Sequence, residues 1–486
     1  MKEPRRERAA SGSLKRGACG SAVANRELGR AALRSLLALA VSALTACGTA
    51  SGSLSPGGPD EDPRPTLSMQ ETSALDLLSP QVLPAPPPDV SNRFADDPRA
   101  AAFGEKMFSE TSMSGPLLDS DNDAMNGSLG SPGQAGKVAC ISCHEPEAGY
   151  SDVHSFQRQI SLGAGWGRRR APSLLDVGQA KLLMWDGRHD TLYNQPFGPI
   201  ESVAEMNSSR LYAAQQVFRG HRGEYEALFG PMPRLDDAQQ FPQVDAATTG
   251  CQPKNRTSPP PTCDGSFHGI PGDRAEFDGL SQENQDAVTR VIVNVGKALG
   301  AYERTLTCGQ GPFDSWLHGD ETALSHAAQR GAQLFVAKAG CVSCHSGPFM
   351  SDQQFHNVGL KPGIVQQAFI DSDDRGAAAG LAAALADPLN SAGKFSDGTD
   401  ARLPTSVTPD MEGAFRTPML RCVSQRPTFM HTGQLPTLER VVAFFNSGGD
   451  TVGYPGSNEI HTLDLSADEQ TDLVAFLMSL SPGAGP

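Results

Sequence analysis

The sequence predicts a mainly α-helical protein of two similar halves, and three observations support this prediction. The pattern C-x-x-C-H occurs twice, at residues 140–144 and 341–345, and each copy is followed by Ser-Asp and then Phe. Apolar residues recur at spacings of three and four in several segments around these motifs. The chain also closes with an amphipathic segment behind a capping box that begins at Ser466.

The two motifs are the attachment signature of c-type haem. Two thiols three positions apart can both form thioethers with one porphyrin, and the adjacent imidazole then lies below the iron. One copy would also suit zinc or thiol redox chemistry, but two copies in matching context favour haem. We therefore expect a mainly α fold with two cytochrome c-like domains, each around one covalent c-type haem. The expected attachment residues and iron ligands are Cys140, Cys143, His144, Cys341, Cys344 and His345.

Residues 1–47 have the features of a lipoprotein signal peptide. Arg30 and Arg34 precede the apolar residues 36–44, and Leu-Thr-Ala-Cys-Gly follows, with Cys47 at the position that is lipidated in lipoproteins. A simple secretory leader is the alternative. No stretch of eighteen apolar residues occurs, so we expect no transmembrane helix. The expected location is the periplasmic side of a bacterial membrane, with a lipid on Cys47 as the anchor.

The charge of the chain argues against nucleic acid as a partner. The whole chain has a net charge of −15, and the leader carries nine Lys or Arg and three Glu. Subtracting +6 for the leader from −15 leaves about −21 for the remaining residues. Such an acidic body repels phosphate backbones and suits a basic electron-donor protein.

The remaining cysteines are expected to form disulfides, because export leads to an oxidising compartment. Cys251, Cys263, Cys308 and Cys422 are neither in the leader nor in a haem motif. Cys251 and Cys263 flank a Pro-rich loop, so we pair them, which leaves Cys308 with Cys422. Three pairings of the four cysteines remain possible from the sequence alone.

The elements of the first half follow from composition and periodicity. Residues 48–92 are rich in Ser, Gly and Pro, which predicts a flexible tether. Residues 100–108 have a helical pattern, and residues 163–206 are loop-rich, with buried-type side chains beside Arg, Gln and Glu. Residues 231–279 are Pro-rich and read as an insertion. Residues 281–307 form the clearest helix and are expected to bridge the two haem domains.

The second half repeats this organisation around the second motif. Residues 327–339 are helical and lead into Cys341. Residues 376–398 are rich in Ala and Gly and are expected to form a loop. A helix is expected from Leu438, and another follows the capping box Ser466–Glu469.

Several further motifs carry a family resemblance. They are Arg-x-Ala-Pro-Ser-Leu-Leu from residue 169, Trp-Asp-Gly-Arg from 185, Gln-x-x-Gly-Pro-Ile from 195, Glu-Arg-Thr-Leu from 303 and Arg-Thr-Pro-x-Leu-Arg from 416. With them the sequence resembles the bacterial di-haem cytochrome c peroxidase family, which includes the MauG-type enzymes, over residues 93–482. The resemblance implies a peroxidatic haem domain at 93–307 and an electron-transfer cytochrome c domain at 308–486.

The resemblance also assigns roles around the first haem. Gln195, Pro199 and Glu205 match the distal pocket of the family, and Trp185 matches a tryptophan that passes charge between the haems. The chemistry agrees, because heterolysis of H2O2 requires a proton to move from the inner to the outer oxygen, and a neighbouring carboxylate can move it. We expect Glu205 to act as general acid and base, and Gln195 to orient the peroxide.

Departures from the family concern the groups on the open faces of the haems. Ala164 stands where many family peroxidases have a distal His, which predicts an open, five-coordinate first haem, although His154 could still reach it. Phe445 stands where the family has the Met or Tyr ligand of the second haem. Met430 is the expected substitute, and Met419 is the second candidate.

Two further departures concern the region between the haems. Arg170 and Arg426 occupy positions from which the family binds a calcium ion, which argues against calcium here. Our hypothesis is that these guanidinium groups replace the charge of the ion near the haem propionates. Cys422 stands where the family usually has Asn, which favours the Cys308–Cys422 pairing.

The expected function is that of a cytochrome-c peroxidase, an oxidoreductase of type EC 1.11.1.5. It would reduce H2O2 to water with electrons from a small periplasmic redox protein, either a cytochrome c or a cupredoxin. The alternatives are a MauG-type oxidase acting on a protein or small organic substrate, and a non-catalytic electron-transfer lipoprotein. The resemblance also makes a homodimer a candidate assembly.

Overall fold

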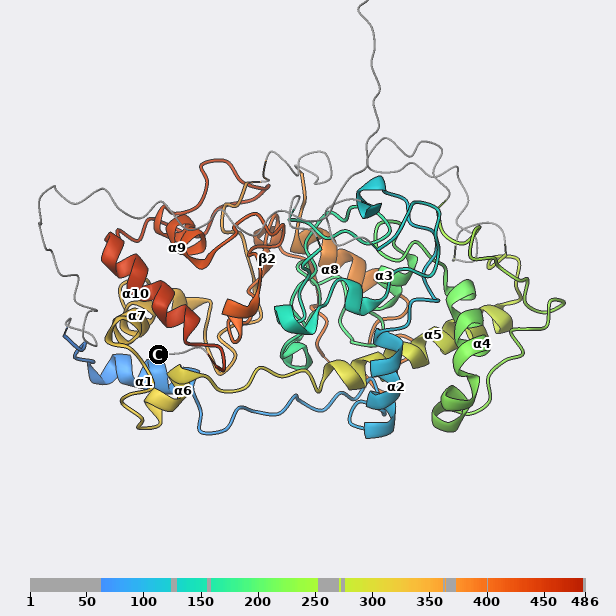
Figure 1. Cartoon of the computed structure of the whole chain (residues 1–486), viewed down its shortest axis with the longest axis horizontal. Helices are drawn as coiled ribbons and strands as arrows, with labels where there is room; N and C mark the ends of the chain where they lie inside the picture. The colour runs from blue at the N-terminus through green and yellow to red at the C-terminus, as the bar shows by residue number, and fades with distance from the viewer. Residues whose placement is uncertain are drawn as a thin grey trace, which may run out of the picture. The chain divides into compact units, whose positions relative to one another are not determined.

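The computed structural model describes residues 63–123, 129–154, 159–251, 271, 276–361, 363, 373–399 and 401–483, which belong to one compact unit. The mainly α fold is confirmed (Figure 1). The α-helices of the described residues are α1 (Met69–Leu78), α2 (Pro98–Phe108), α3 (Phe197–Glu201), α4 (Arg210–Phe229), α5 (Gln282–Glu303), α6 (Pro312–Leu317), α7 (His326–Val336), α8 (Ala377–Ala386), α9 (Leu438–Asn446) and α10 (Ala467–Met478). None of them is long and apolar enough to span a membrane.

The extended structure within these ranges is small. Strands β1 (Phe355–His356) and β2 (Phe415–Arg416) pair antiparallel, with Phe355 opposite Arg416. Most of the chain between the helices is therefore loop, as its Pro and Gly content suggests.

Each half is built on one pair of closely packed helices, α2 with α5 and α7 with α10 (Figure 1). A Cβ atom at Gly104 of α2 would overlap the carbonyl oxygen of Ala298 on α5. A Cβ atom at Gly331 of α7 would overlap the carbonyl oxygen of Asp472 on α10 in the same way. Glycine thus lets both helix pairs approach closely, and the two pairs are equivalent elements of an internal repeat.

The helix signals of the sequence are confirmed where they were strongest. The Ser281 side chain caps α5, and Ser466 and Glu469 form the expected reciprocal capping box at the start of α10. Helix α5 packs on α2 and α4, so it forms the core of the first half. Residues between α5 and α6, rather than α5 itself, lead into the second half.

Residues 63–92 differ from the flexible tether that their composition predicted. They contain α1, whose Leu75 and Leu78 are fully buried in the core of the second half. The residues after α1 accept hydrogen bonds at the Pro84 carbonyl from Gln179 and at the Pro87 carbonyl from Arg304. Buried leucines and paired carbonyls hold this segment to the protein in spite of its Pro-rich sequence. The rest of the expected tether and the leader with Cys47 lie outside the described residues.

Two other segments also differ from expectation. Residues 376–398 were expected to be a loop, but they contain α8, because a run of alanines has the highest helix propensity. Residues 231–279 were expected to be an insertion, yet Leu235, Phe241 and Val244 lie in the core of the first half. Described residues of both segments are therefore part of the packed structure.

One of the expected disulfides is present between described residues. Cys308 and Cys422 are bonded, which confirms that pairing. Cys251 is also disulfide-bonded, while Cys263, its expected partner, lies outside the described residues. The four motif cysteines are unpaired, so no disulfide competes for them.

Candidate haem-binding sites

The first motif forms a tight turn that presents His144. Residues Cys140–Ser142 are a 3₁₀ helix, and the His144 amide donates to the Cys140 carbonyl. The His144 Nδ1 lies 3.0 Å from the Tyr150 carbonyl oxygen, which can only accept, so Nδ1 carries the proton. Burial lowers the pKa of His144, which favours the neutral ring. Its Nε2 is therefore the atom left for a metal, as in ligating histidines generally.

The second motif repeats this arrangement. Residues Cys341–Ser343 are a 3₁₀ helix, and His345 Nδ1 lies 2.9 Å from the Met350 carbonyl oxygen. Phe335 lies 6.5 Å from the His345 ring, as Phe108 lies 6.4 Å from His144. The structure thus brings the predicted attachment residues of each haem together in one turn.

A cavity of about 560 Å³ opens beside the second motif. Cys341, Cys344 and His345 line it, together with apolar side chains of α7, α9 and α10. An apolar cavity beside two unpaired cysteines and an oriented imidazole fits a haem.

Cationic groups in the same cavity fit the propionates of a haem. Arg416 and Arg426 both line the cavity, and burial lowers the pKa of each guanidinium to about 10. Neither forms an ion pair with a carboxylate of the described residues; they donate to the carbonyls of Met184 and Met419. The buried Nε2 of His431 also has no hydrogen-bond partner there. Uncompensated buried cations require an anion, and haem supplies two carboxylates.

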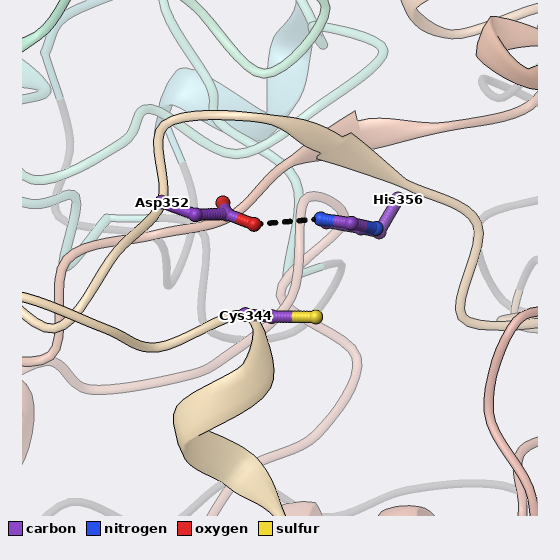
Figure 2. Close-up of side chains that lie close together, drawn as sticks. All are labelled: Cys344, Asp352 and His356. Atoms are coloured by element: carbon purple, nitrogen blue, oxygen red, sulfur yellow. Dashed lines mark hydrogen bonds and ion pairs between the residues drawn. The ribbon is translucent and has the colours of Figure 1, made fainter. Parts of the chain in front are cut away.

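A cluster with metal-ligand geometry lies at the rim of this cavity. Figure 2 shows Cys344, Asp352 and His356 side by side, with the His356 Nε2 2.9 Å from the Asp352 carboxylate. The His356 Nδ1 is held at 2.6 Å by Glu459. Because Cys344 belongs to the C-x-x-C-H motif, its sulfur is the expected attachment atom of the second haem. We therefore assign the cluster to the second haem site and not to a separate metal.

The internal repeat also includes residues 170–187 of the first half, which are equivalent to residues 416–433 of the second half. The backbone amide of Arg170 donates to the His431 carbonyl, and the amide of Arg416 donates to the Trp185 carbonyl, both at 2.8 Å. The Trp185 and His431 rings lie 6.4 Å apart. Trp185 therefore lies where the two halves meet and lines the second cavity, although it belongs to the first half.

Among the predicted distal residues, Glu205 is the one whose charge acts on the first motif. Burial, and to a smaller extent the negative charge of Glu205, raise the pKa of the Cys140 and Cys143 thiols, so the Glu205 carboxylate lies in the neighbourhood of that site. Burial raises the pKa of Glu205, an effect that the charge of Arg188 partly offsets. The Gln195 amide donates to the Met184 sulfur at 3.6 Å, and Pro199 lies in the short helix α3.

The loop that contains Ala164 is bound to the backbone of residues 204 and 205. The Ala164 amide donates to the Glu205 carbonyl at 2.6 Å, and the Ala164 side chain is fully buried. His154, the other candidate for this face, lies between Glu145 and Asp152, with nitrogen–oxygen distances of 3.7 and 3.6 Å. Ala164 cannot ligate a metal, and both His154 nitrogens face carboxylates.

Only one of the two methionines that were expected as distal ligands of the second haem lies at the second cavity. Met430 lines the second cavity, as does Phe445, whereas Met419 is buried and is not among the lining residues. His461 also lines the cavity, and the sequence analysis missed it. It lies outside every motif, so only its place in the fold could have found it.

Comparisons with known proteins agree with these sites. Residues 98–249 match the family model described as di-haem cytochrome c peroxidase. MauG of Methylorubrum extorquens is 30% identical over 348 residues, which cover 71% of this chain and 73% of that protein. The chain belongs to the di-haem cytochrome c peroxidase family.

Relatives within the family carry both kinds of name. The cytochrome-c peroxidase IdrP1 of Denitromonas iodatirespirans is 27% identical over 417 residues. The aligned region includes 84% of this chain and 88% of that protein. The diheme peroxidase BthA of Burkholderia thailandensis shares the fold with a TM-score of 0.56 and 20% identity, covering 84% of this chain and 96% of its own. Membership of the di-haem family implies haem c cofactors and an oxidoreductase activity, and it leaves peroxidase and MauG-type reactions as the two candidates.

Proposed function

We propose that this di-haem family member is a cytochrome-c peroxidase that reduces H2O2 to two waters with two electrons and two protons. The observation that carries the proposal is Glu205. Its carboxylate is close enough to the first C-x-x-C-H site for its charge to act on Cys140, burial raises its pKa, and the neighbouring Ala164, whose amide binds the Glu205 carbonyl, offers no ligand atom. A buried carboxylate of raised pKa beside an open face suits general acid and base catalysis near neutral pH.

The residues around the first site would divide the work as follows. Haem c, held by thioethers from Cys140 and Cys143 and ligated by His144, would supply the iron at which peroxide binds and is cleaved. Glu205 would accept the proton of the inner peroxide oxygen and deliver it to the outer oxygen. The Gln195 amide would orient the peroxide by a hydrogen bond, and Pro199 would restrict the space beside it.

Electrons would enter through the second half. Cys341, Cys344 and His345 would hold the second haem in the cavity that Arg416 and Arg426 line. Trp185 lines that cavity and is part of the first half, so it is the candidate relay between the two sites.

The test mixes the resting ferric protein with H2O2 and follows the Soret band on the millisecond scale before a reduced small cytochrome c is added. Rapid loss or shift of the Soret band followed by oxidation of the cytochrome would support a peroxidase that needs no prior reduction. If the protein does not react with peroxide, the peroxidase proposal fails, and the non-catalytic electron-transfer function is supported instead.

The MauG-type reaction is the second candidate, and the 30% identity to a MauG protein favours it. In that case the stored oxidising equivalents would act on a protein or a small organic substrate. It predicts a long-lived oxidised state that reduced cytochrome does not discharge, so the same experiment separates the two functions.

The location and partners follow from the acidic body and the leader. We propose an exported, periplasmic protein anchored by a lipid on Cys47, with a small basic cytochrome c or cupredoxin as donor. A homodimer is a further candidate. Labelling with a radioactive fatty acid would test the anchor, because a Cys47→Ser variant should lose the label.

We predict that calcium removal leaves the protein unchanged. Arg170 and Arg426 line the second cavity where the family resemblance places calcium, and their guanidinium charges would serve the propionates instead. Dialysis against a calcium chelator should therefore preserve peroxide turnover and both haem spectra. Restoration of lost activity by added calcium would contradict this prediction.

We also predict that Met430 is the distal ligand of the second haem. Met430 lines the cavity, while Phe445 offers no donor atom and Met419 is not among the lining residues. Met430→Ala should convert the second haem from low to high spin in the visible and near-infrared spectra. Met419→Ala is the control and should leave the spectra unchanged; an unaltered spectrum of Met430→Ala would direct attention to His431 and His461.

A further inference from the structure

Two phenols face each other on the proximal side of the first haem site. The Tyr150 and Tyr302 hydroxyl oxygens lie 3.5 Å apart. The backbone carbonyl oxygen of Tyr150 also accepts a hydrogen bond from His144 Nδ1, at a nitrogen–oxygen distance of 3.0 Å. Phe108 contacts both phenols, with ring centroids 6.3 Å from Tyr150 and 5.3 Å from Tyr302. The pair is therefore linked to the expected iron ligand by a hydrogen bond and by an aromatic contact.

The second site has the same scaffold without the phenols. Phe335 replaces Phe108, and the ring of Phe476 lies 5.1 Å from it at a tilt of 57°, where Tyr302 lies 5.3 Å from Phe108 at 58°. Met350 supplies the carbonyl that binds the histidine, in place of Tyr150. The packing of the first site thus needs no phenol, since Phe and Met serve equally at the second.

These two phenols are also the more accessible ones. The chain has six tyrosines, and Tyr193, Tyr212, Tyr225 and Tyr454 are all at most 4% exposed. Tyr150 and Tyr302 are half-buried. Partial burial and the hydrogen bond to Tyr150 raise the pKa of Tyr302, so this phenol keeps its proton in the resting protein.

We propose that Tyr150 and Tyr302 form a redox-active pair that reduces the oxidised first-haem site when no electron arrives from the second half, a proposal that rests on the peroxidase function above. A phenol that is oxidised loses one electron to that site and its O–H proton to water, and becomes a phenoxyl radical; the two protons released by the pair equal the two that peroxide takes up to form water. One H2O2 and two tyrosines thus give two waters and two phenoxyl radicals. Atoms and electrons balance with peroxide as the oxidant.

The pair would reduce the first-haem site after its reaction with peroxide, so that oxidation is confined to these two side chains. At the second site Met350 and Phe476 lack the dissociable proton that makes a phenol easy to oxidise. The presence of phenols at the haem that meets peroxide, and their replacement at the electron-entry haem, is the distribution that such a role requires.

The test freezes the ferric holoprotein milliseconds after it meets H2O2 without any donor and records its electron paramagnetic resonance spectrum. An organic radical is expected whose signal narrows when the protein carries ring-deuterated tyrosine. The Tyr150→Phe/Tyr302→Phe double variant should lose this radical, and its oxidised Soret intermediate should decay more slowly. Tyr225→Phe is the matched control, because Tyr225 lies in the same half and hydrogen-bonds Asn294 instead.

Stopped-flow Soret spectra recorded in parallel separate this inference from the proposed function. A Soret change with no radical, with a radical insensitive to tyrosine deuteration, or with a radical that persists in the double variant would overturn the pair while the peroxidase proposal stands. No Soret change in the wild-type protein would overturn both. The deuterated wild-type sample keeps the test valid even if the double variant folds poorly.

Discussion

Glu205→Gln should lower kcat/KM for H2O2 by about 10²–10⁴-fold, the usual contribution of one general acid–base group. The amide keeps the shape and a hydrogen-bond donor but cannot accept the proton of the inner peroxide oxygen. The variant should retain both haem spectra, because Gln has nearly the shape of Glu and the residue-205 backbone still binds the Ala164 amide. Stopped-flow measurement of the peroxide reaction would give the change directly.

The control is Glu224→Gln, which alters a carboxylate that pairs with Lys106 on the exposed side of α4. It should leave the peroxide reaction unchanged. If Glu205→Gln reacted as fast as the wild-type protein, Glu205 would not be the proton carrier. That result would support the non-catalytic electron-transfer function.

The pH profile should carry the signature of the same residue. Glu205 must be ionised to accept a proton, so the rate falls as the pH drops through its pKa. Burial raises that pKa above the usual glutamate value of 4.5, so the acid limb should lie above pH 4.5. The limb should disappear in Glu205→Gln, whereas its persistence would assign it to another group.

Arg421→Met should destabilise the protein by about 3–5 kcal/mol, because it leaves a buried carboxylate without its partner. Arg421 is fully buried and binds both oxygens of Asp314 at 2.9 Å. It also donates to the carbonyls of Leu78 in α1 and Pro348 beside the second haem motif. One guanidinium thus joins α1, α6 and the haem loop. Urea unfolding of the holoprotein, followed by circular dichroism, would measure the loss.

Asp314→Asn in the Arg421→Met background should recover part of that stability, since it removes the unpaired charge. Arg375→Met is the control, because the Arg375–Glu412 pair is solvent-exposed and should matter far less. Equal effects of Arg421→Met and Arg375→Met would contradict the buried-pair argument.

The same pair predicts an acid dependence of stability. Burial alone would raise the pKa of Asp314, but the hydrogen bonds and charge of Arg421 lower it below the usual 3.8. A carboxylate whose pKa is lowered by folding stabilises the folded protein. This stabilisation is fully present above pH 3.8, the usual pKa of Asp, and is lost as the pH falls through the lower pKa of Asp314 in the folded protein. Arg421→Met should abolish this part of the acid sensitivity.

Short-range signals were enough for much of the fold. The C-x-x-C-H turns, the capping box of Ser466 and Glu469 and the apolar spacing of α5 are each carried by short stretches of sequence, and each appears as expected. The alanine run of α8 was misread as a loop because its glycines were given more weight than its helix propensity. Helix α4 was not predicted, since Gly220 and Gly223 interrupt its pattern.

The sequence by itself determined the two C-x-x-C-H motifs, the histidine of each and the acidic charge of the chain, because local spacing and composition carry this information. The tertiary structure decided the rest. It buries Leu75 and Leu78 against the second half, directs Arg416 and Arg426 into one cavity, and brings Tyr150 within 3.5 Å of Tyr302. These contacts join residues far apart in the chain, and their energies depend on burial and charge that exist only after folding.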